Sequence, residues 1–185
     1  MKVKNTIIEG VKIITPEVFE DSRGNFMESW NRESLVDIGI VEDFVQDNIS
    51  FSFKDVLRGV HTQFCSQSKL VSCLSGEIFD VTVDCRKNSP SFGKWFGEYL
   101  TFENRKQVFI PAGVAHGYYA VENSVVLMKV TTHYKKGDEI GFLWNDTDIA
   151  IEWPISNSDN IIFAEKDLHW GSFKELVSAI GDFHC

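Results

Sequence analysis

The chain has 185 residues, with 18 basic and 27 acidic side chains and a formal net charge of −9 at pH 7. Hydrophobic residues make up 43% and charged residues 24%, a balance that is typical of a globular protein and excludes wholesale disorder. The acidic excess argues against a nucleic-acid-binding surface, since that affinity comes mainly from basic residues on phosphates. The sequence has neither a long apolar run nor a signal-peptide pattern. We therefore expect one domain over residues 1–185, with no nucleic-acid or membrane partner.

Most of the expected elements are short strands, because segments rich in Val, Ile, Phe and Thr recur between turn residues. Two short helices are expected, one at 31–38 and one at about 172–182, where Ser172 caps apolar residues spaced i, i+3, i+4 and i+7. This arrangement predicts a mostly β fold, a barrel of jelly-roll type with short peripheral helices. In chain order the strand candidates are 11–15, 44–50, 56–63, 69–74, 76–84, 94–100, 107–110, 116–121 and 125–132.

The strand candidate 76–84 has the clearest alternation of apolar and polar residues. Phe79, Val81 and Val83 fall on one face. Asp80 and Asp84 fall on the other face, where two carboxylates in a packed core would carry a heavy desolvation cost. The acidic face therefore lines a polar interior, as in barrels that hold ligands, or it meets solvent. The sequence does not decide between these two interpretations.

The four cysteines, at 65, 73, 85 and 185, include no CxxC pair, so neither a zinc ribbon nor a thioredoxin-like motif is indicated. Two disulfides are conceivable, but a chain of this size and apolar content does not need them. We expect reduced thiols and a cytoplasmic protein.

Two histidines, His61 and His116, lie in expected strands, where a lone histidine is usually a surface or hydrogen-bonded residue. The stretch from Pro111 to His116 is similar to the second half of the cupin metal motif. The first half would need a second histidine at position 63, which is Gln63, and a glutamate close by. Because this ligand set is incomplete, we expect no metal.

Several short blocks follow one another in an order typical of one known family. They are 19–28, 44–50, 56–61, 69–71, 76–84, 89–95, 110–117, 144–146 and 151–154. Each block alone is weak evidence, but so many in one order are specific. From about residue 10 to residue 168 the chain resembles the dTDP-4-dehydrorhamnose 3,5-epimerase family, nucleotide-sugar epimerases with a cupin jelly roll.

The resemblance implies an isomerase that inverts carbons beside the C4 ketone of a dTDP-4-keto-6-deoxyhexose, for deoxysugar and cell-surface polysaccharide synthesis, without metal or redox cofactor. It assigns the base to His61 and the carboxylate that orients it to Asp167. A neutral imidazole suits removal of a weakly acidic proton, and a carboxylate fixes its tautomer and stabilises the imidazolium. Lys69, with Arg58 nearby, would stabilise the developing enolate.

The remaining site residues are also implied by the resemblance. Tyr134 matches an aromatic residue that stacks on the nucleotide base. Arg23 and Glu28 match residues that reach into the neighbouring subunit's site, which implies a homodimer with shared sites. The other ligand-contacting positions are Gln46, Asp47, Asn48, His116, Glu139 and Lys166.

One departure from the family concerns its second catalytic residue, a tyrosine six residues before the stacking aromatic. That position is Met128, and a thioether cannot donate a proton. Either Tyr118, Tyr119 or a water takes the acid role, or only part of the reaction survives. Thr62 and Lys136 also depart from the residues usual at their positions. We therefore expect inversion of C3, with C5 in question.

Two further functions compete with this interpretation. A catalytically impaired sugar-nucleotide-binding cupin would explain the loss of the tyrosine, although a binding module has no need for the oriented base that His61 and Asp167 would form. A metal-dependent cupin dioxygenase is disfavoured by the missing ligands. The sequence does not identify the sugar, and dTDP is the nucleotide that the family suggests.

Overall fold

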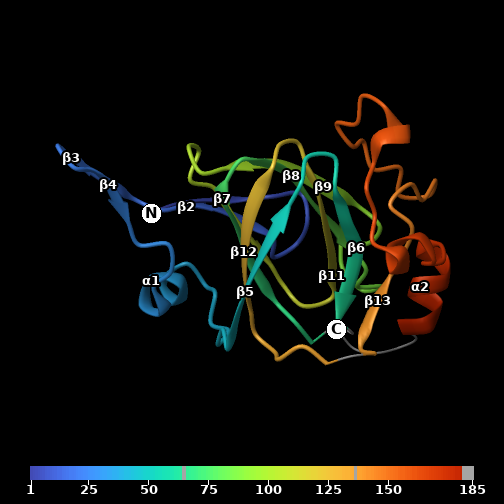
Figure 1. The fold of residues 1–185 in the computed structure, drawn as a ribbon. Coiled ribbons are helices and arrows are strands. Elements are labelled where there is room, and N and C mark those ends of the chain that lie inside the picture. Colours follow the sequence, from blue (N-terminus) through green and yellow to red (C-terminus); the bar gives the residue numbers. More distant parts are fainter. Residues whose placement is uncertain (64–65, 136, 181–185) are drawn as a thin grey trace.

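A computed structural model describes residues 1–63, 66–135 and 137–180, which form two antiparallel sheets that face each other as a barrel (Figure 1). In strand order, sheet I contains β1 (Lys2–Asn5), β2 (Lys12–Thr15), β10 (Gln107–Ile110), β7 (Lys69–Ser75), β12 (Ser124–Val130) and β5 (Gln46–Ser52). Sheet II contains β13 (Glu139–Gly141), β6 (Leu57–Gln63), β11 (Val114–Ala120), β8 (Glu77–Asp84) and β9 (Trp95–Thr101).

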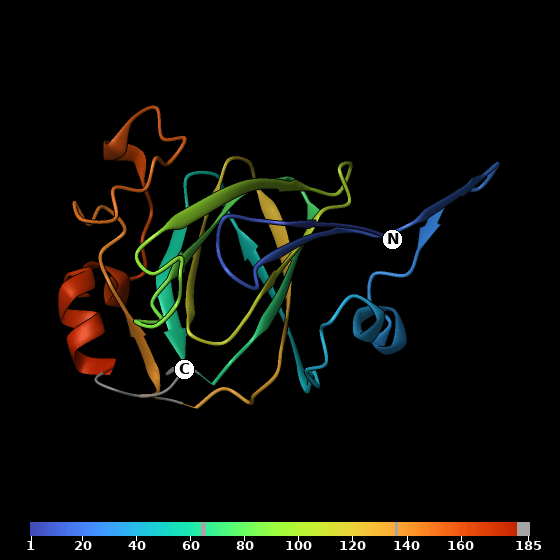
Figure 2. The ribbon, with the colours of Figure 1, turned by 180° about the vertical axis from the view of Figure 1, so that it is seen from behind.

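The predicted jelly-roll class is confirmed, and every predicted strand is present with its ends within two residues of the expected ones. The strands that were not predicted are all short: β1, β13, β3 (Val18–Asp21) and β4 (Gly24–Met27). Three or four residues give little alternation to identify a strand, although β2 and β10, of four residues each, were predicted. β3 and β4 form a hairpin that projects from the barrel beside the N-terminus (Figures 1 and 2).

Both predicted helices are present. α1 (Arg32–Asp37) begins after Asn31, whose side chain accepts a hydrogen bond from the Ser34 amide. α2 (Phe173–Ile180) begins with a capping box, in which Ser172 and Glu175 each accept a hydrogen bond from the other's amide. The last two residues of the predicted helix, 181–182, lie outside the described residues. Two 3₁₀ turns, η1 (Ser158–Asn160) and η2 (Glu165–Leu168), precede α2.

Apolar side chains pack in three layers. The largest cluster fills part of the barrel interior, a second lies between sheet II and α2, and a third lies between sheet I and the segment that contains α1. In β8, Phe79, Val81 and Val83 belong to the layer under α2. Asp80 and Asp84 face the other way and are 1% and 0% exposed. The interpretation in which this acidic face meets solvent is therefore wrong.

Cys73 and Cys85 are buried free thiols, as expected. Burial raises the pKa of Cys73 to about 11 and that of Cys85 to about 12, so both remain protonated and unreactive near neutral pH. Cys65, Cys185 and the departure at Lys136 lie outside the described residues. None of the described helices is long and apolar enough to cross a membrane.

Candidate active site

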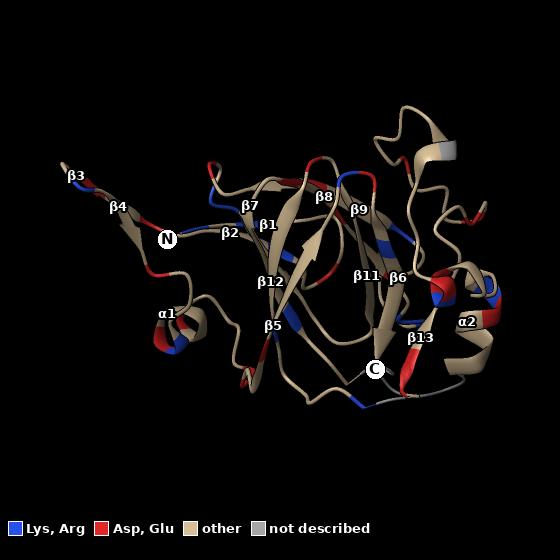
Figure 3. Ribbon diagram, viewed as in Figure 1, with Lys and Arg blue, Asp and Glu red and all other residues tan. Residues whose placement is uncertain are grey.

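The polar part of the barrel interior is built by β5, β6, β7, β8, β11 and β13. Figure 3 marks a basic segment on β6 and an acidic segment on β13, its partner strand. The side chains of His61 and Glu139 are 22% and 16% exposed, so solvent reaches the interior at these two strands. This is the region to which most of the predicted site residues belong.

The position of His61 depends on a close approach of β6 and β11, which pairs His61 directly with His116. Gly59 has φ +110°, and a Cβ there would lie 2.6 Å from the Gly117 Cα. A Cβ on Gly117 would lie 2.8 Å from the Arg58 carbonyl oxygen. Larger side chains would separate the strands, so these glycines permit the two imidazoles to share one face.

The environment of His61 keeps its imidazole neutral. Burial is the main cause that lowers the pKa of His61 well below its usual value of 6.5, and the positive charges of Lys69 and Arg58 lower it further. The nearest carboxylate is that of Glu139, whose Oε1 lies 3.4 Å from Nδ1. A neutral imidazole with a free lone pair is the form that can accept a proton.

Lys69 lies on the inner face of β7 and is only 5% exposed. Burial lowers the pKa of its ammonium to about 8, although the carboxylates of Glu139 and Asp80 oppose this shift. The side chain is therefore mostly charged at neutral pH and lies close enough to His61 to influence its titration. A buried cation beside a neutral base can stabilise a negative charge that develops there.

His116 forms a buried pair with Asp80, its Nε2 lying 2.6 Å from Oδ2. Asp80 was not assigned to the site from the sequence, although its place on the acidic face of β8 was the signal that could have found it. The second oxygen of Asp80 is buried and has no hydrogen-bond partner among the described residues. The pair fixes the ring of His116 next to His61.

Asp167 lies in η2 and is 2% exposed. Its carboxylate accepts hydrogen bonds from the Trp170 indole and from the Gly59 amide, two residues before His61 on β6. Burial raises the pKa of Asp167 despite these bonds. No hydrogen bond joins the described side chains of His61 and Asp167. The carboxylate instead contacts the backbone of β6, the strand that carries His61.

Strand β5 divides its three predicted ligand-contacting residues between two faces. Gln46 and Asn48 point inward, and the Gln46 amide donates to Asn48 Oδ1 at 2.7 Å. Asp47 is exposed on the outer face, where Lys129 Nζ lies 2.7 and 2.8 Å from its two oxygens. The structure therefore brings Gln46 and Asn48, but not Asp47, to the barrel interior of this chain.

Tyr134, expected to stack on the nucleotide base, and Lys166, expected to contact the ligand, each contact another predicted site residue. Tyr134 is 58% exposed, and its amide donates to Gln46 Oε1 at 3.3 Å. Lys166 is exposed and forms an ion pair with Glu139. An exposed ring and an exposed cation beside the polar interior are suited to contact a base and a phosphate.

Arg58 and Met128 both border the polar interior. Arg58 lies at the start of β6, and its Nε donates to Ser52 Oγ at 3.0 Å. Met128 packs against the barrel core and pairs in register with Asn48 on β5 and Val71 on β7. Met128, which replaces the family tyrosine, therefore lies beside Asn48, a predicted ligand-contacting residue.

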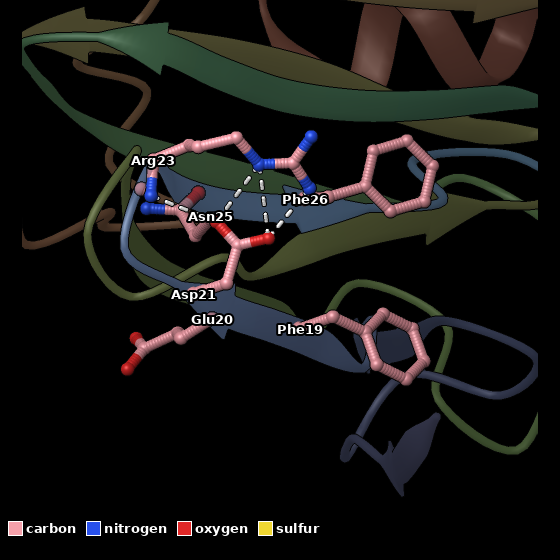
Figure 4. Close-up of a pocket in the computed structure, with 7 residues that line it drawn as sticks. Phe19, Glu20, Asp21, Arg23, Asn25 and Phe26 are labelled. Carbon is pink, nitrogen blue, oxygen red and sulfur yellow. Dashed lines mark hydrogen bonds and ion pairs between the residues drawn. The ribbon is translucent and has the colours of Figure 1, made fainter.

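Arg23 and Glu28 lie away from the barrel interior of their own chain. Arg23 is at the turn of the β3–β4 hairpin and pairs with Asp21 at 2.6 Å, while Glu28 accepts a hydrogen bond from Asn31. Figure 4 shows that the rings of Phe19 and Phe26 point the same way along this hairpin, next to a hollow of about 450 Å³. Within one chain, Arg23 and Glu28 contact Asp21 and Asn31 and not the barrel interior, so the site contacts predicted for them require a second subunit.

Chemically, the site offers a neutral base and a buried cation in one polar interior, with the His116–Asp80 pair beside them. These groups can remove a proton from a carbon next to a ketone and stabilise the enolate oxygen. In the described part of the chain, no three His, Cys, Asp or Glu residues are grouped as metal ligands.

Comparisons with known proteins agree on one family. The family model described as dTDP-4-dehydrorhamnose 3,5-epimerase matches residues 5–175. The chain is 49% identical to the dTDP-4-dehydrorhamnose 3,5-epimerase of Salmonella typhimurium over 160 residues, which are 84% of this chain and 87% of that protein.

Solved structures are similar over nearly the whole chain. A dTDP-6-deoxy-D-glucose-3,5-epimerase from Legionella pneumophila, in complex with dTDP-4-keto-L-rhamnose, has a TM-score of 0.92 and 39% identity, covering 97% of this chain and 96% of that one. A 3′-monoepimerase from Streptomyces bikiniensis, in complex with dTDP-quinovose, has a TM-score of 0.84 and 26% identity, covering 94% and 88%.

Proposed function

This chain belongs to the dTDP-4-dehydrorhamnose 3,5-epimerase family, and we propose from this premise that it epimerises a dTDP-linked 4-keto-6-deoxyhexose at C3 with His61 as the base. The observation that carries the proposal is the neutral, partly exposed imidazole of His61 beside the buried ammonium of Lys69. Proton removal next to a ketone needs both groups at once.

In the proposed reaction, His61 takes the proton from C3 and the electrons of the C3–H bond form the C3–C4 enolate. The Lys69 ammonium stabilises the negative charge on the ketone oxygen. Asp167 holds β6 through the Gly59 amide and supplies the negative charge that favours the imidazolium. Delivery of a proton to the opposite face of C3 then completes the inversion.

Met128 supports inversion of C3 alone. The thioether at this position cannot donate a proton to a second carbon. If His61 also removes the C5 proton, it can only return a proton to the same face, which gives exchange without inversion.

Substrate binding is proposed to use groups from two copies of the chain. Ile49, Phe51 and Phe53 are 68%, 54% and 62% exposed on and beside the outer face of β5, and this apolar patch is suited to contact a second subunit. Arg23 and Glu28 would then reach the partner's nucleotide from the hairpin. We also propose that the protein acts in the cytoplasm, since free thiols such as Cys73 and Cys85 are usual in a reducing compartment.

The test is a product assay with dTDP-4-keto-6-deoxyglucose, the 3,5-epimer of the dTDP-4-keto-L-rhamnose bound by the Legionella pneumophila relative. Proton NMR of the reaction should show a product inverted at C3. The same sugar on GDP serves as the control for nucleotide choice. If the sugar nucleotide binds but is neither exchanged nor inverted, the protein is a binding module that lost catalysis with its tyrosine.

A further inference from the structure

The proposed reaction needs a proton donor on the side of the sugar opposite His61, and the barrel holds a series of hydrogen-bonded hydroxyl groups that includes Tyr118, one of the donors left open by the sequence. Tyr118, on the inner face of β11, is 1% exposed, and its hydroxyl lies 2.9 Å from both Ser50 Oγ and Ser52 Oγ on β5. These hydrogen bonds join sheet II to sheet I across the interior. Arg58 Nε contacts Ser52 Oγ at 3.0 Å.

Arg58 determines which group donates in each hydrogen bond of this series of hydroxyl groups. A guanidinium can only donate, so Ser52 accepts from Arg58. Ser52 is 1% exposed, and a buried hydroxyl hydrogen must find an acceptor, which is the Tyr118 oxygen. Tyr118 then donates to Ser50. Among the described residues, the hydrogen of the Ser50 hydroxyl is left without an acceptor, and Ser50 is the partly exposed member of the three hydroxyl groups.

The place of Ser50 fits a donor that opposes His61. Ser50 lies on sheet I, whereas His61 lies on sheet II, so the two groups approach a bound sugar from different walls of the barrel. In the β5–β12 ladder Met128 pairs with Asn48 and Val126 pairs with Ser50. Ser50 is therefore the diagonal neighbour of Met128, about 7 Å away between Cα atoms.

We propose that Ser50, with Tyr118 behind it, delivers the proton to C3 on the face opposite His61; this inference rests on the function proposed above. C3 of the enolate takes the Ser50 proton while Ser50 Oγ takes the Tyr118 proton. The resulting tyrosinate is stabilised by the hydrogen bond from Ser52, itself oriented by the Arg58 cation. After product release, water returns a proton to Tyr118 and removes one from the His61 imidazolium, so no proton is gained or lost.

Tyr119 provides the matched control for Tyr118. It is the next residue on β11, points to the other face of sheet II, and its hydroxyl donates to Asp55. Burial and Asp55 raise the pKa of Tyr119 to about 12. Because Tyr119 lies on the face of β11 opposite Tyr118 and its hydroxyl is bonded to Asp55, this hydroxyl is not part of the series inside the barrel.

The experiment measures two rates at C3 of dTDP-4-keto-6-deoxyglucose in heavy water: deuterium incorporation and inversion. In Ser50→Ala and Tyr118→Phe, we expect inversion to fall by about 10²-fold while His61 continues to exchange the proton on its own face. Tyr119→Phe should change neither rate. Ser50→Ala removes one partly exposed hydroxyl, so it tests the chain even if Tyr118→Phe folds poorly.

Unchanged inversion in Ser50→Ala, or a parallel fall of exchange and inversion in both variants, would overturn the hydroxyl chain and leave the proposed function standing. Wild-type protein that neither exchanges nor inverts C3 would instead overturn the proposed function, and the hydroxyl chain with it.

Discussion

Strands β5 and β10 belong to the same sheet, yet they present opposite kinds of side chain to the barrel interior. β10 directs Val108 and Ile110 inward, and both belong to the main apolar core. On the outer face of β5, two apolar residues, Ile49 and Phe51, are exposed next to Asp47. The inward residues of β5 are Gln46, Asn48, Ser50 and Ser52.

The comparison separates the part of the barrel interior that stabilises the fold, at β10, from the part that is proposed to bind substrate, at β5. β10 follows the usual rule that apolar side chains are buried, and it contributes to stability through the hydrophobic effect. β5 departs from that rule, since its inward residues are polar and two apolar residues, Ile49 and Phe51, are exposed on its outer face. The polar side chains on the inner face of β5 are suited to contact the substrate, and the exposed apolar side chains on its outer face are suited to contact a second subunit. β5 therefore takes part in both proposed contacts.

The largest expected effect comes from making the polar side of the interior apolar. Lys69→Met keeps the shape of the side chain but removes the cation, so we expect kcat/KM to fall by about 10²- to 10³-fold. Burial already disfavours the charged form of Lys69, so the melting temperature should not fall. Steady-state kinetics and thermal unfolding of the same sample measure both quantities.

The matched change on the apolar side is Val108→Thr, which places an unpaired hydroxyl in the core. We expect a loss of about 1–3 kcal/mol in the free energy of unfolding with kcat/KM retained at temperatures where the protein is folded. A large loss of activity in this variant, or none in Lys69→Met, would mean that the two sides of the interior are not functionally distinct.

Asp167→Asn should lower kcat by about 10²-fold through weaker stabilisation of the imidazolium, with little change in folding. Glu139→Gln is the comparison, because Glu139 is the carboxylate 3.4 Å from His61 Nδ1. A greater loss of kcat in Glu139→Gln than in Asp167→Asn would transfer the orienting role to Glu139.

The outer face of β5 is tested by Phe51→Glu, which places a charge in the centre of the exposed apolar patch. We expect the dimer to dissociate, as measured by size-exclusion chromatography with light scattering, and activity to fall because Arg23 and Glu28 would no longer reach a partner's site. Ile162→Glu, at another exposed apolar residue, should leave assembly unchanged. A wild-type protein that is monomeric would contradict the shared-site arrangement.

The pH dependence of kcat/KM should reflect the two buried groups. The lowered pKa of His61 keeps the base neutral, so activity should persist below pH 6.5 and fall only well below it. The pKa of Lys69 at about 8 means that activity should decline as pH rises through that value. Lys69→Arg retains the charge and should move the basic limb upward; an unmoved limb would assign it to another group.

The smallest expected effect is a gain. Met128→Tyr supplies a phenol beside Asn48, so a doubly inverted product should form several-fold faster than in wild type, as measured by NMR. The larger ring could cost about 1–3 kcal/mol through overpacking, and thermal unfolding must accompany the assay. Comparable inversion of C3 and C5 by wild type would show that another donor already replaces the tyrosine.

The sequence predicted the long strands because their alternation reports burial directly, as in β8. It also indicated which face of β8 was unusual, but not that Asp80 pairs with His116, because that contact depends on the register of β8 with β11. For Asp47 the family resemblance implied a ligand contact, but in β5 it alternates with Gln46 and Asn48 and faces outward. The short strand β13 carries Glu139 to His61 by pairing with β6, and three residues give no pattern from which that pairing could be read.

The most direct test of the central claim is deuterium incorporation at C3 of dTDP-4-keto-6-deoxyglucose, measured by NMR for wild type and His61→Asn side by side in heavy water. The account predicts that wild type incorporates deuterium at C3 and inverts it, while His61→Asn incorporates none, since no other group is assigned to remove that proton. Substantial incorporation by the variant would remove His61 from the mechanism, and none by wild type would contradict the proposed activity.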